Sequence, residues 1–211
     1  MIVTTCMKKN ILIAVLCLST FYANAQTATT QAAARTPDTN KNDTPKHVKI
    51  RVIGGGQMSS ADDVVQNIAK SKEHTTFTNS IAVCGLAETL KSRGPLTIFA
   101  PTNDAFNKLS PGMLDTLLKP QHNAELTRLL TYHVIPGKLT SKDIARQINS
   151  NNGEATFTTL SGSKLKAKIN GDRNIVLIDE GGNESVISQF DIEQNNGIID
   201  VVTGLLIPKN K

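Results

Sequence analysis

The stretch KLKAKINGDRNIVLI, residues 164–178, decides the fold class because its polarity alternates with a period of two. Leucine, alanine and isoleucine fall on one face of an extended chain, and three lysines fall on the other. That alternation is typical of a strand with one buried and one solvated face. Asn170-Gly171-Asp172 then predicts a tight turn, and the apolar run 175–178 predicts the returning strand. The stretch therefore predicts an antiparallel hairpin.

Further strand signals lie on both sides of this hairpin. Residues 155–159 alternate before it, and the apolar segments 186–192 and 198–207 follow it after glycine-containing turns. Four or five successive strands of this kind predict an antiparallel sheet.

The chain upstream of the strands has a different period. Apolar residues between 59 and 150 recur mainly at helical spacing, with one long helical stretch over 75–93 and a clear helix from Asn123. Because helices come first and most strands come later, the sequence predicts an α+β fold rather than alternating βαβ units.

The N-terminus has the pattern of a secretory signal peptide over residues 1–25. Lys8 and Lys9 precede the apolar run 11–22, and Ala23-Asn24-Ala25 supplies the small residues of a cleavage site. The alternative is a membrane anchor, but the run is shorter than the roughly 20 residues that span a bilayer. We therefore expect an exported protein, periplasmic, secreted or at the cell surface, with no transmembrane anchor after cleavage.

Two segments separate this leader from the domain. Residues 26–46 contain no bulky apolar side chain, which predicts a disordered spacer. Residues 47–53 alternate briefly and lead into a triple glycine. The expected organisation is a signal peptide over 1–25, a spacer and lead-in over 26–58, and one folded domain over 59–208.

Charge and composition exclude several classes of function. The 211 residues carry a net charge of +5, which falls to +3 without residues 1–25 because that segment holds two basic residues and no acidic one. With no tryptophan and two tyrosines, the chain offers little for stacking on bases. We therefore expect no nucleic-acid partner.

Cys84 is the one cysteine that remains after the expected cleavage, so we expect no disulfide within the domain.

Three stretches in order resemble a fasciclin domain. They are Thr97-Ile-Phe-Ala-Pro-Thr-Asn-Asp-Ala-Phe-Asn-Lys-Leu109, Leu129-Leu-Thr-Tyr-His-Val-Ile-Pro-Gly137 and Asn196-Gly-Ile-Ile-Asp-Val-Val-Thr-Gly-Leu-Leu-Ile-Pro208. They match the family's first box, its Tyr-His motif and its second box. The resemblance covers about residues 59–208 and implies a β-wedge or sandwich with helices packed to one side.

The resemblance also implies a function in adhesion, through binding to a protein or glycan at a cell surface or matrix, or through self-association. Tyr132 and His133 match the Tyr-His motif linked to adhesion, and Asn103 and Asp104 match the first box. Each has a structural alternative. Asn103 and Asp104 stand where helix caps belong, and Tyr132 and His133 suit buried hydrogen bonds at a helix-to-strand junction.

The second box departs from the family pattern at two positions. Asp200 stands where the family usually has histidine, and Thr203 where it has aspartate. Contacts that the family assigns to those side chains are therefore not expected to carry over unchanged.

No motif in the sequence predicts catalysis. The histidines lack metal-ligand spacing, no nucleophile elbow occurs, and we expect no enzyme activity, no metal and no cofactor. Two alternatives stay open. One is a small-ligand binder with an apolar groove between helices and sheet. The other is an exported hydrolase, which needs a nucleophile within hydrogen-bond reach of His133.

Overall fold

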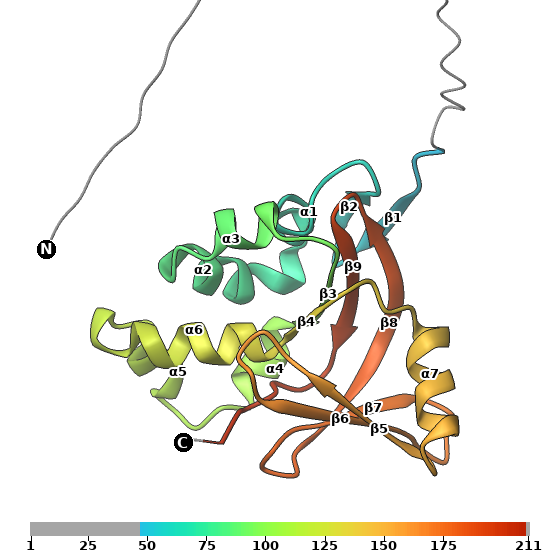
Figure 1. Cartoon of the computed structure of the whole chain (residues 1–211). Helices are drawn as coiled ribbons and strands as arrows, with labels where there is room; N and C mark the ends of the chain where they lie inside the picture. The colour runs from blue at the N-terminus through green and yellow to red at the C-terminus, as the bar shows by residue number, and fades with distance from the viewer. Residues whose placement is uncertain (1–46, 210–211) are drawn as a thin grey trace, which may run out of the picture. The chain divides into compact units, whose positions relative to one another are not determined.

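The computed structural model describes residues 47–209, and Figure 1 shows how its helices and strands are arranged. The α-helices are α1 (Val64–Lys70), α2 (Thr75–Val83), α3 (Ala87–Ser92), α4 (Asn103–Asn107), α5 (Met113–Leu117), α6 (Asn123–Tyr132) and α7 (Ser141–Ser150). Two short 3-10 helices are η1 (Lys72–His74) and η2 (Pro120–His122). The strands are β1 (Ile50–Ile53), β2 (Gly56–Ser59), β3 (Leu96–Pro101), β4 (Val134–Pro136), β5 (Glu154–Thr158), β6 (Lys164–Ile169), β7 (Ile175–Ile178), β8 (Glu184–Gln194) and β9 (Gly197–Val202).

The main sheet has seven strands in the order β4-β3-β9-β8-β7-β6-β5. Strands β5 to β9 form the successive antiparallel pairs that the sequence predicts. The sheet also contains one parallel pair that the sequence does not predict, between β3 and β9, starting at Leu96 opposite Gly197. Both strands are buried along their whole length, as is usual for parallel pairs covered on both faces. The α+β fold class is confirmed.

Local sequence sets where most helices begin and end. Asp63 caps α1 by accepting from the Gln66 N–H, and Gln66 returns a bond to the Asp63 N–H. The single helix expected over 75–93 is instead two helices, because Gly85 has φ = +65° between them. A left-handed glycine closes the end of a helix rather than continuing it.

The buried apolar side chains form two clusters. One joins helices α1 to α6 to strands β3 and β9, and Figure 1 shows these helices gathered on one side of the sheet. The other joins α7 to strands β5, β6 and β7, with Ile144 and Ile148 of α7 facing inward. Tyr132 and Phe99 belong to this second cluster. Helices α1 to α6 therefore cover one part of the sheet, and α7 alone covers another.

The lead-in segment forms a β-hairpin of strands β1 and β2. Gly54 and Gly55 connect the strands with φ values of +54° and +74°, the pair of left-handed residues that a tight two-residue turn needs. Ile53 and Met58 are 1% exposed and join the helical core cluster. The predicted signal peptide and the spacer over 26–46 lie outside the described residues. Within residues 47–209 no helix is long and apolar enough to cross a membrane.

Candidate interaction site

Tyr132 is a buried anchor at the end of α6. Its ring is 0% exposed, and its hydroxyl donates to the Lys164 carbonyl oxygen at 2.8 Å. The same hydroxyl accepts from the Glu180 N–H at 3.1 Å. Burial raises the pKa of the Tyr132 phenol far above its usual value. Tyr132 therefore ties the end of α6 to the start of β6 and to the turn after β7.

His133 is buried beside Tyr132 and binds two backbone groups. Its Nδ1 lies 2.9 Å from the Leu129 carbonyl oxygen, and its Nε2 accepts from the Leu206 N–H at 3.1 Å. A carbonyl oxygen accepts only, so Nδ1 carries the proton and the ring is neutral. Burial lowers the pKa of His133 to about 4. This side chain therefore joins α6 to the segment that follows β9.

Two acidic residues hold the same C-terminal segment, residues 203–209. Asp179 Oδ2 accepts from the Ile207 N–H at 3.0 Å, and Glu180 Oε2 accepts from the Lys209 N–H at 2.9 Å. Asp179 Oδ1 also accepts from the N–H groups of the turn after β7. The sequence suggests only a turn here, since nothing local shows that the carboxylates reach the end of the chain.

Asn103 and Asp104 lie at the start of α4, apart from the Tyr-His motif. Asn103 Oδ1 accepts from the Thr76 N–H at 3.0 Å, and its Nδ2 donates to the Lys72 carbonyl oxygen at 2.9 Å. Asn103 therefore joins α4 to η1 and α2, while Thr102 provides the helix cap by accepting from the Ala105 N–H. The Asp104 side chain is exposed.

A polar surface depression of about 670 Å³ surrounds Asn103 and Asp104. Its other lining residues are Gly54, Lys72, Glu73, Thr102, Lys108 and Thr203. Lys108 donates to the Thr203 carbonyl oxygen at 2.8 Å across it. The depression offers charged groups of both signs, and it brings the first box next to the second. The sequence motifs point to Asn103 and Asp104, but Lys72, Glu73 and Lys108 come together only in the fold.

Asp200 is a buried carboxyl group in the middle of β9. Its Oδ1 accepts from the Asp191 N–H at 2.8 Å, and its Oδ2 has no hydrogen-bond partner among the described residues. Burial raises the pKa of Asp200 to about 7. Asp191, which has φ = +54°, in turn accepts from the Ser141 N–H at the start of α7. Thr203 is structural as well, since its hydroxyl accepts from the Val186 N–H.

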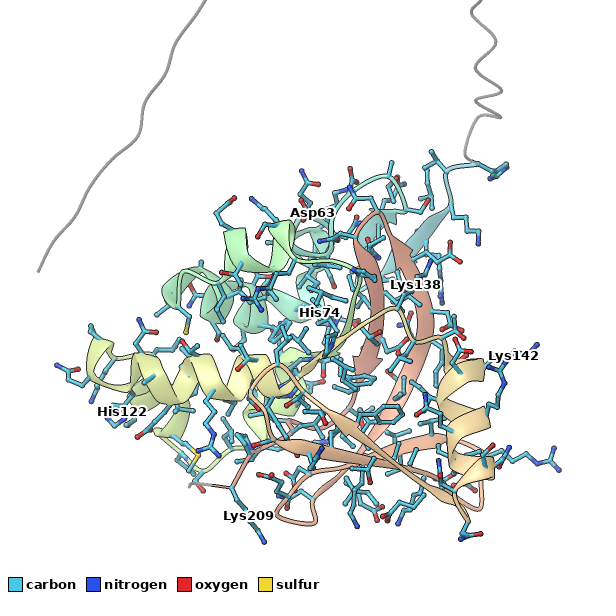
Figure 2. All side chains as sticks on the ribbon, viewed as in Figure 1. Asp63, His74, His122, Lys138, Lys142 and Lys209 are labelled. Carbon is cyan, nitrogen blue, oxygen red and sulfur yellow. The ribbon has the colours of Figure 1, made fainter. Side chains whose placement is uncertain are left out.

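The geometry around the histidines bears on the hydrolase alternative. Backbone groups occupy both ring nitrogens of His133, so no hydroxyl or thiol is paired with that ring. Ser71 Oγ does lie 2.8 Å from His74 Nδ1. Both side chains are buried, at 1% and 0% exposed, and Figure 2 shows His74 in the interior of the domain while His122 lies at its periphery. The Ser71–His74 pair is therefore closed to a substrate.

A second, apolar hollow lies between α5, α6 and the C-terminal segment. It measures about 490 Å³ and includes Met113, Leu117, Leu129 and Ile207, with Arg128 among its polar lining residues. The Met113 side chain is 44% exposed and Ile207 is 38% exposed. Within residues 47–209 no group of three or more His, Cys, Asp or Glu side chains is placed to hold a metal ion.

Comparison with known proteins identifies the family. The model of the Fasciclin domain matches residues 72–208, which is more than half of the chain. The chain belongs to the fasciclin family. The match includes both boxes and the Tyr-His motif, and it begins after the β1–β2 hairpin and α1.

Similar proteins occur in bacteria and in animals. Protein sll1483 of Synechocystis sp. is 32% identical over 161 residues, covering 76% of this chain and 81% of that protein. Human periostin is 28% identical over 172 residues, covering 75% of this chain but only 19% of periostin. A solved FAS1 domain pair from the insect cell adhesion molecule Fasciclin I has a TM-score of 0.52 and 25% identity. That match covers 62% of this chain and 43% of the insect chain.

Proposed function

We propose that this fasciclin-family chain is an exported, non-enzymatic interaction domain that binds a protein or a glycan at a cell surface or in a matrix, with self-association as a further mode. The polar depression around Asn103 and Asp104 is the observation that carries the proposal. The solved insect relative, described as a cell adhesion molecule, supports the same class of function. The signal-peptide pattern of residues 1–25 supports export.

The four motif residues have different roles in this proposal. Asp104 is exposed and contacts the partner directly, together with Lys72 and Lys108 at the rim of the depression. Asn103 positions that rim through its bonds to η1 and α2. Tyr132 and His133 are fully buried and act through the position of the C-terminal segment, whose Thr203 lines the same depression.

Replacing Asp104 with alanine is the direct test of the depression. The exposed side chain makes one long contact to Asn107 at 3.5 Å, so we expect a change in unfolding free energy below about 0.5 kcal/mol. Binding to the glycan or matrix protein that scores highest on an array should weaken about tenfold, as expected for the loss of a charged contact. Surface plasmon resonance with residues 26–211 would measure the dissociation constant.

Asn103→Ala is the matched variant from the same box. It removes the bonds to Thr76 and Lys72 and should cost about 1–3 kcal/mol of stability. Asp172→Ala, in an exposed turn outside the depression, serves as the control. It should change neither the binding affinity nor the free energy of unfolding. Unchanged binding by a folded Asp104→Ala variant would exclude the depression as the contact site.

The apolar hollow favours a second candidate function, the binding of a small amphipathic ligand. Its volume is in the range of ligand pockets, and it combines apolar side chains with the Arg128 cation.

The dye 8-anilinonaphthalene-1-sulfonate is a suitable probe of the apolar hollow because it pairs an apolar ring system with an anion. Met113→Asp should reduce the dye's fluorescence gain at least about threefold, because a carboxylate in the apolar site repels the dye's sulfonate. Val83→Asp, at an equally exposed apolar position on α2, should leave it unchanged. Equal dye binding by both variants would remove this candidate.

A further inference from the structure

The outer edge of strand β1 carries an exposed apolar row. Val48, Ile50 and Val52 are 48%, 62% and 67% exposed. Alternate residues of a strand point to the same face, so these three side chains form one stripe. The intervening Lys49 and Arg51 point to the opposite face, toward β8. A row of exposed β-branched residues along an edge strand is the feature that most soluble domains avoid.

The backbone of the same residues is unpaired on its outer side. The hairpin closes at Ile53 opposite Gly56, and the Ser60 N–H donates to the Lys49 carbonyl oxygen at 2.9 Å. Hydrogen-bonded and non-hydrogen-bonded pairs alternate in an antiparallel ladder. Ile50 and Val52 are therefore at non-hydrogen-bonded positions, and their N–H and C=O groups point away from β2. Among residues 47–209 no other strand pairs with this edge.

The charge beside the row limits what can pair with it. Lys49 forms an ion pair with Glu193 at 2.9 Å. Arg51 donates to the Phe190 carbonyl oxygen and has no ion pair within the described part of the chain. A strand added to the edge would therefore place one of its side chains opposite the Arg51 guanidinium group. An acidic side chain at that position gains a partner, and a basic one is repelled.

A second copy of this chain fits the edge poorly for that reason. A two-fold pairing centred on Ile50 sets Arg51 of one copy opposite Lys49 of the other. A pairing centred on Arg51 sets the two arginines opposite each other. Like charges directly opposite in a ladder are destabilising, so both registers are disfavoured.

We propose that the β1 edge, residues 48–52, docks an extended segment of another protein, in which apolar β-branched residues alternate with acidic ones. The segment adds to β1 as an antiparallel strand. Its backbone bonds the outward groups of Ile50 and Val52, its apolar side chains cover the exposed row, and its acidic side chains face Arg51. Gly54 in the hairpin turn lines the depression at Asn103 and Asp104, but residues 48–52 do not, so the β1 edge is a distinct surface.

Two synthetic peptides test the proposed chemistry on the whole chain. The first, fluorescein-labelled Thr-Val-Glu-Val-Glu-Val-Thr, has the proposed alternation, and the second replaces both glutamates with lysine. Fluorescence anisotropy at low salt should show the acidic peptide binding at least about tenfold more tightly, because Arg51 attracts a glutamate opposite it and repels a lysine. Amide exchange of Ile50 and Val52 should slow on binding.

Three variants separate the backbone, apolar and charge contributions. Val52→Pro removes one outward N–H and no bond to β2, and it should weaken binding of the acidic peptide at least about tenfold. The double variant Ile50→Thr, Val52→Thr keeps β-branched side chains and should weaken binding to a similar extent. Arg51→Gln should lower the preference for the acidic peptide to about twofold or less. Val83→Thr makes the same kind of substitution at an exposed position on α2 and should have no effect.

The outcomes are distinct. A folded Val52→Pro variant that binds the acidic peptide like the wild type would overturn the proposal. Equal affinity of the wild type for the two peptides, or no binding of either peptide, would also overturn it. A concentration-dependent dimer in sedimentation that Val52→Pro abolishes would show a second copy to be the occupant, and would also overturn it. Asp104→Ala should bind the acidic peptide normally, so failure at the β1 edge and failure at the polar depression are measured independently.

Discussion

Asp200→Asn is expected to raise the free energy of unfolding at pH 8 by about 2–4 kcal/mol, because it removes a buried charge. In the wild type, burial raises the pKa of Asp200 to about 7, and Oδ2 has no hydrogen-bond partner among the described residues. Asparagine has nearly the same shape and keeps an oxygen for the Asp191 N–H. The variant stays neutral at every pH.

The pH dependence gives the sign of this effect. The unfolded chain releases the Asp200 proton near pH 3.8, whereas the folded chain holds it until about pH 7. The stability contributed by the protonated group is therefore complete below pH 3.8 and is lost as the pH rises through 7. Urea unfolding of wild type and variant should give equal stabilities at pH 4 and the largest difference at pH 7–8.

Asp172→Asn is the control for Asp200→Asn. Asp172 is exposed in the turn between β6 and β7, so its replacement should leave the stability difference below about 0.5 kcal/mol at every pH. An Asp200→Asn variant no more stable than the wild type at pH 8 would mean that the folded chain stabilises the Asp200 anion by contacts absent from this structure.

His133→Ala should have the largest destabilising effect of any motif residue, about 3–5 kcal/mol at pH 7.5. The substitution leaves a cavity in the core and removes the acceptor of the Leu206 N–H and the donor to the Leu129 carbonyl oxygen. Tyr132→Phe keeps the ring and should cost less, about 1–3 kcal/mol, since only the bonds to Lys164 and Glu180 are lost. Urea unfolding measures both. The control is His122→Ala at the end of η2, where the ring is half-buried and contacts Glu125 at the surface, and its effect should be below about 0.5 kcal/mol.

A direct probe of His133 avoids the difficulty of an unfolded variant. Its folded pKa is about 4 and its ordinary value is 6.5, so the unfolded chain takes up a proton first as the pH falls. The contribution of the neutral His133 ring to the free energy of unfolding is therefore complete above pH 6.5, and about 3 kcal/mol of it is lost as the pH falls toward 4. Imidazole ¹⁵N shifts of the wild type should show a neutral ring protonated on Nδ1 down to about pH 4. A ring that titrates near pH 6.5 in the folded protein would contradict the buried geometry.

The two titrations oppose each other between pH 4 and 6.5. In that range the unfolded chain carries a proton on His133 and none on Asp200, and the folded chain has the reverse. The two contributions cancel, so the free energy of unfolding of the wild type is nearly independent of pH in this range. Asp200→Asn should uncover the His133 titration, so that the stability of the variant falls by about 3 kcal/mol from pH 6.5 to pH 4.

The strands and several helices follow from the sequence because their information is local. The alternation over residues 164–169 predicts β6 with Leu165 and Ala167 buried, and the structure has both at 0% exposed. Ile169 is the exception, at 37% exposed, since β6 ends there. The helix predicted from Asn123 is α6. Periodicity and turn residues are set within a few positions, so one chain segment is enough to predict them.

The two boxes and the Tyr-His motif also identify the family from the sequence, and the family-model match confirms it. They do not show what Tyr132 and His133 do. The bonds of Tyr132 reach Lys164 and Glu180, and that of His133 reaches Leu206, 73 positions along the chain. Whether these side chains lie at the surface or in the core depends on elements that fold against them from a distance.

The sequence by itself determined the α+β class, the strand order along the chain, the family and the presence of Asn103 and Asp104 in a motif. The tertiary structure alone decided the parallel pairing of β3 with β9, the burial of His133 and Asp200, and the exposed edge of β1. The physical reason is that desolvation and pairing depend on which remote segments cover a residue. A strand with one covered edge and a strand with two have the same local pattern, and a carboxyl group has an ordinary pKa until the fold removes its water.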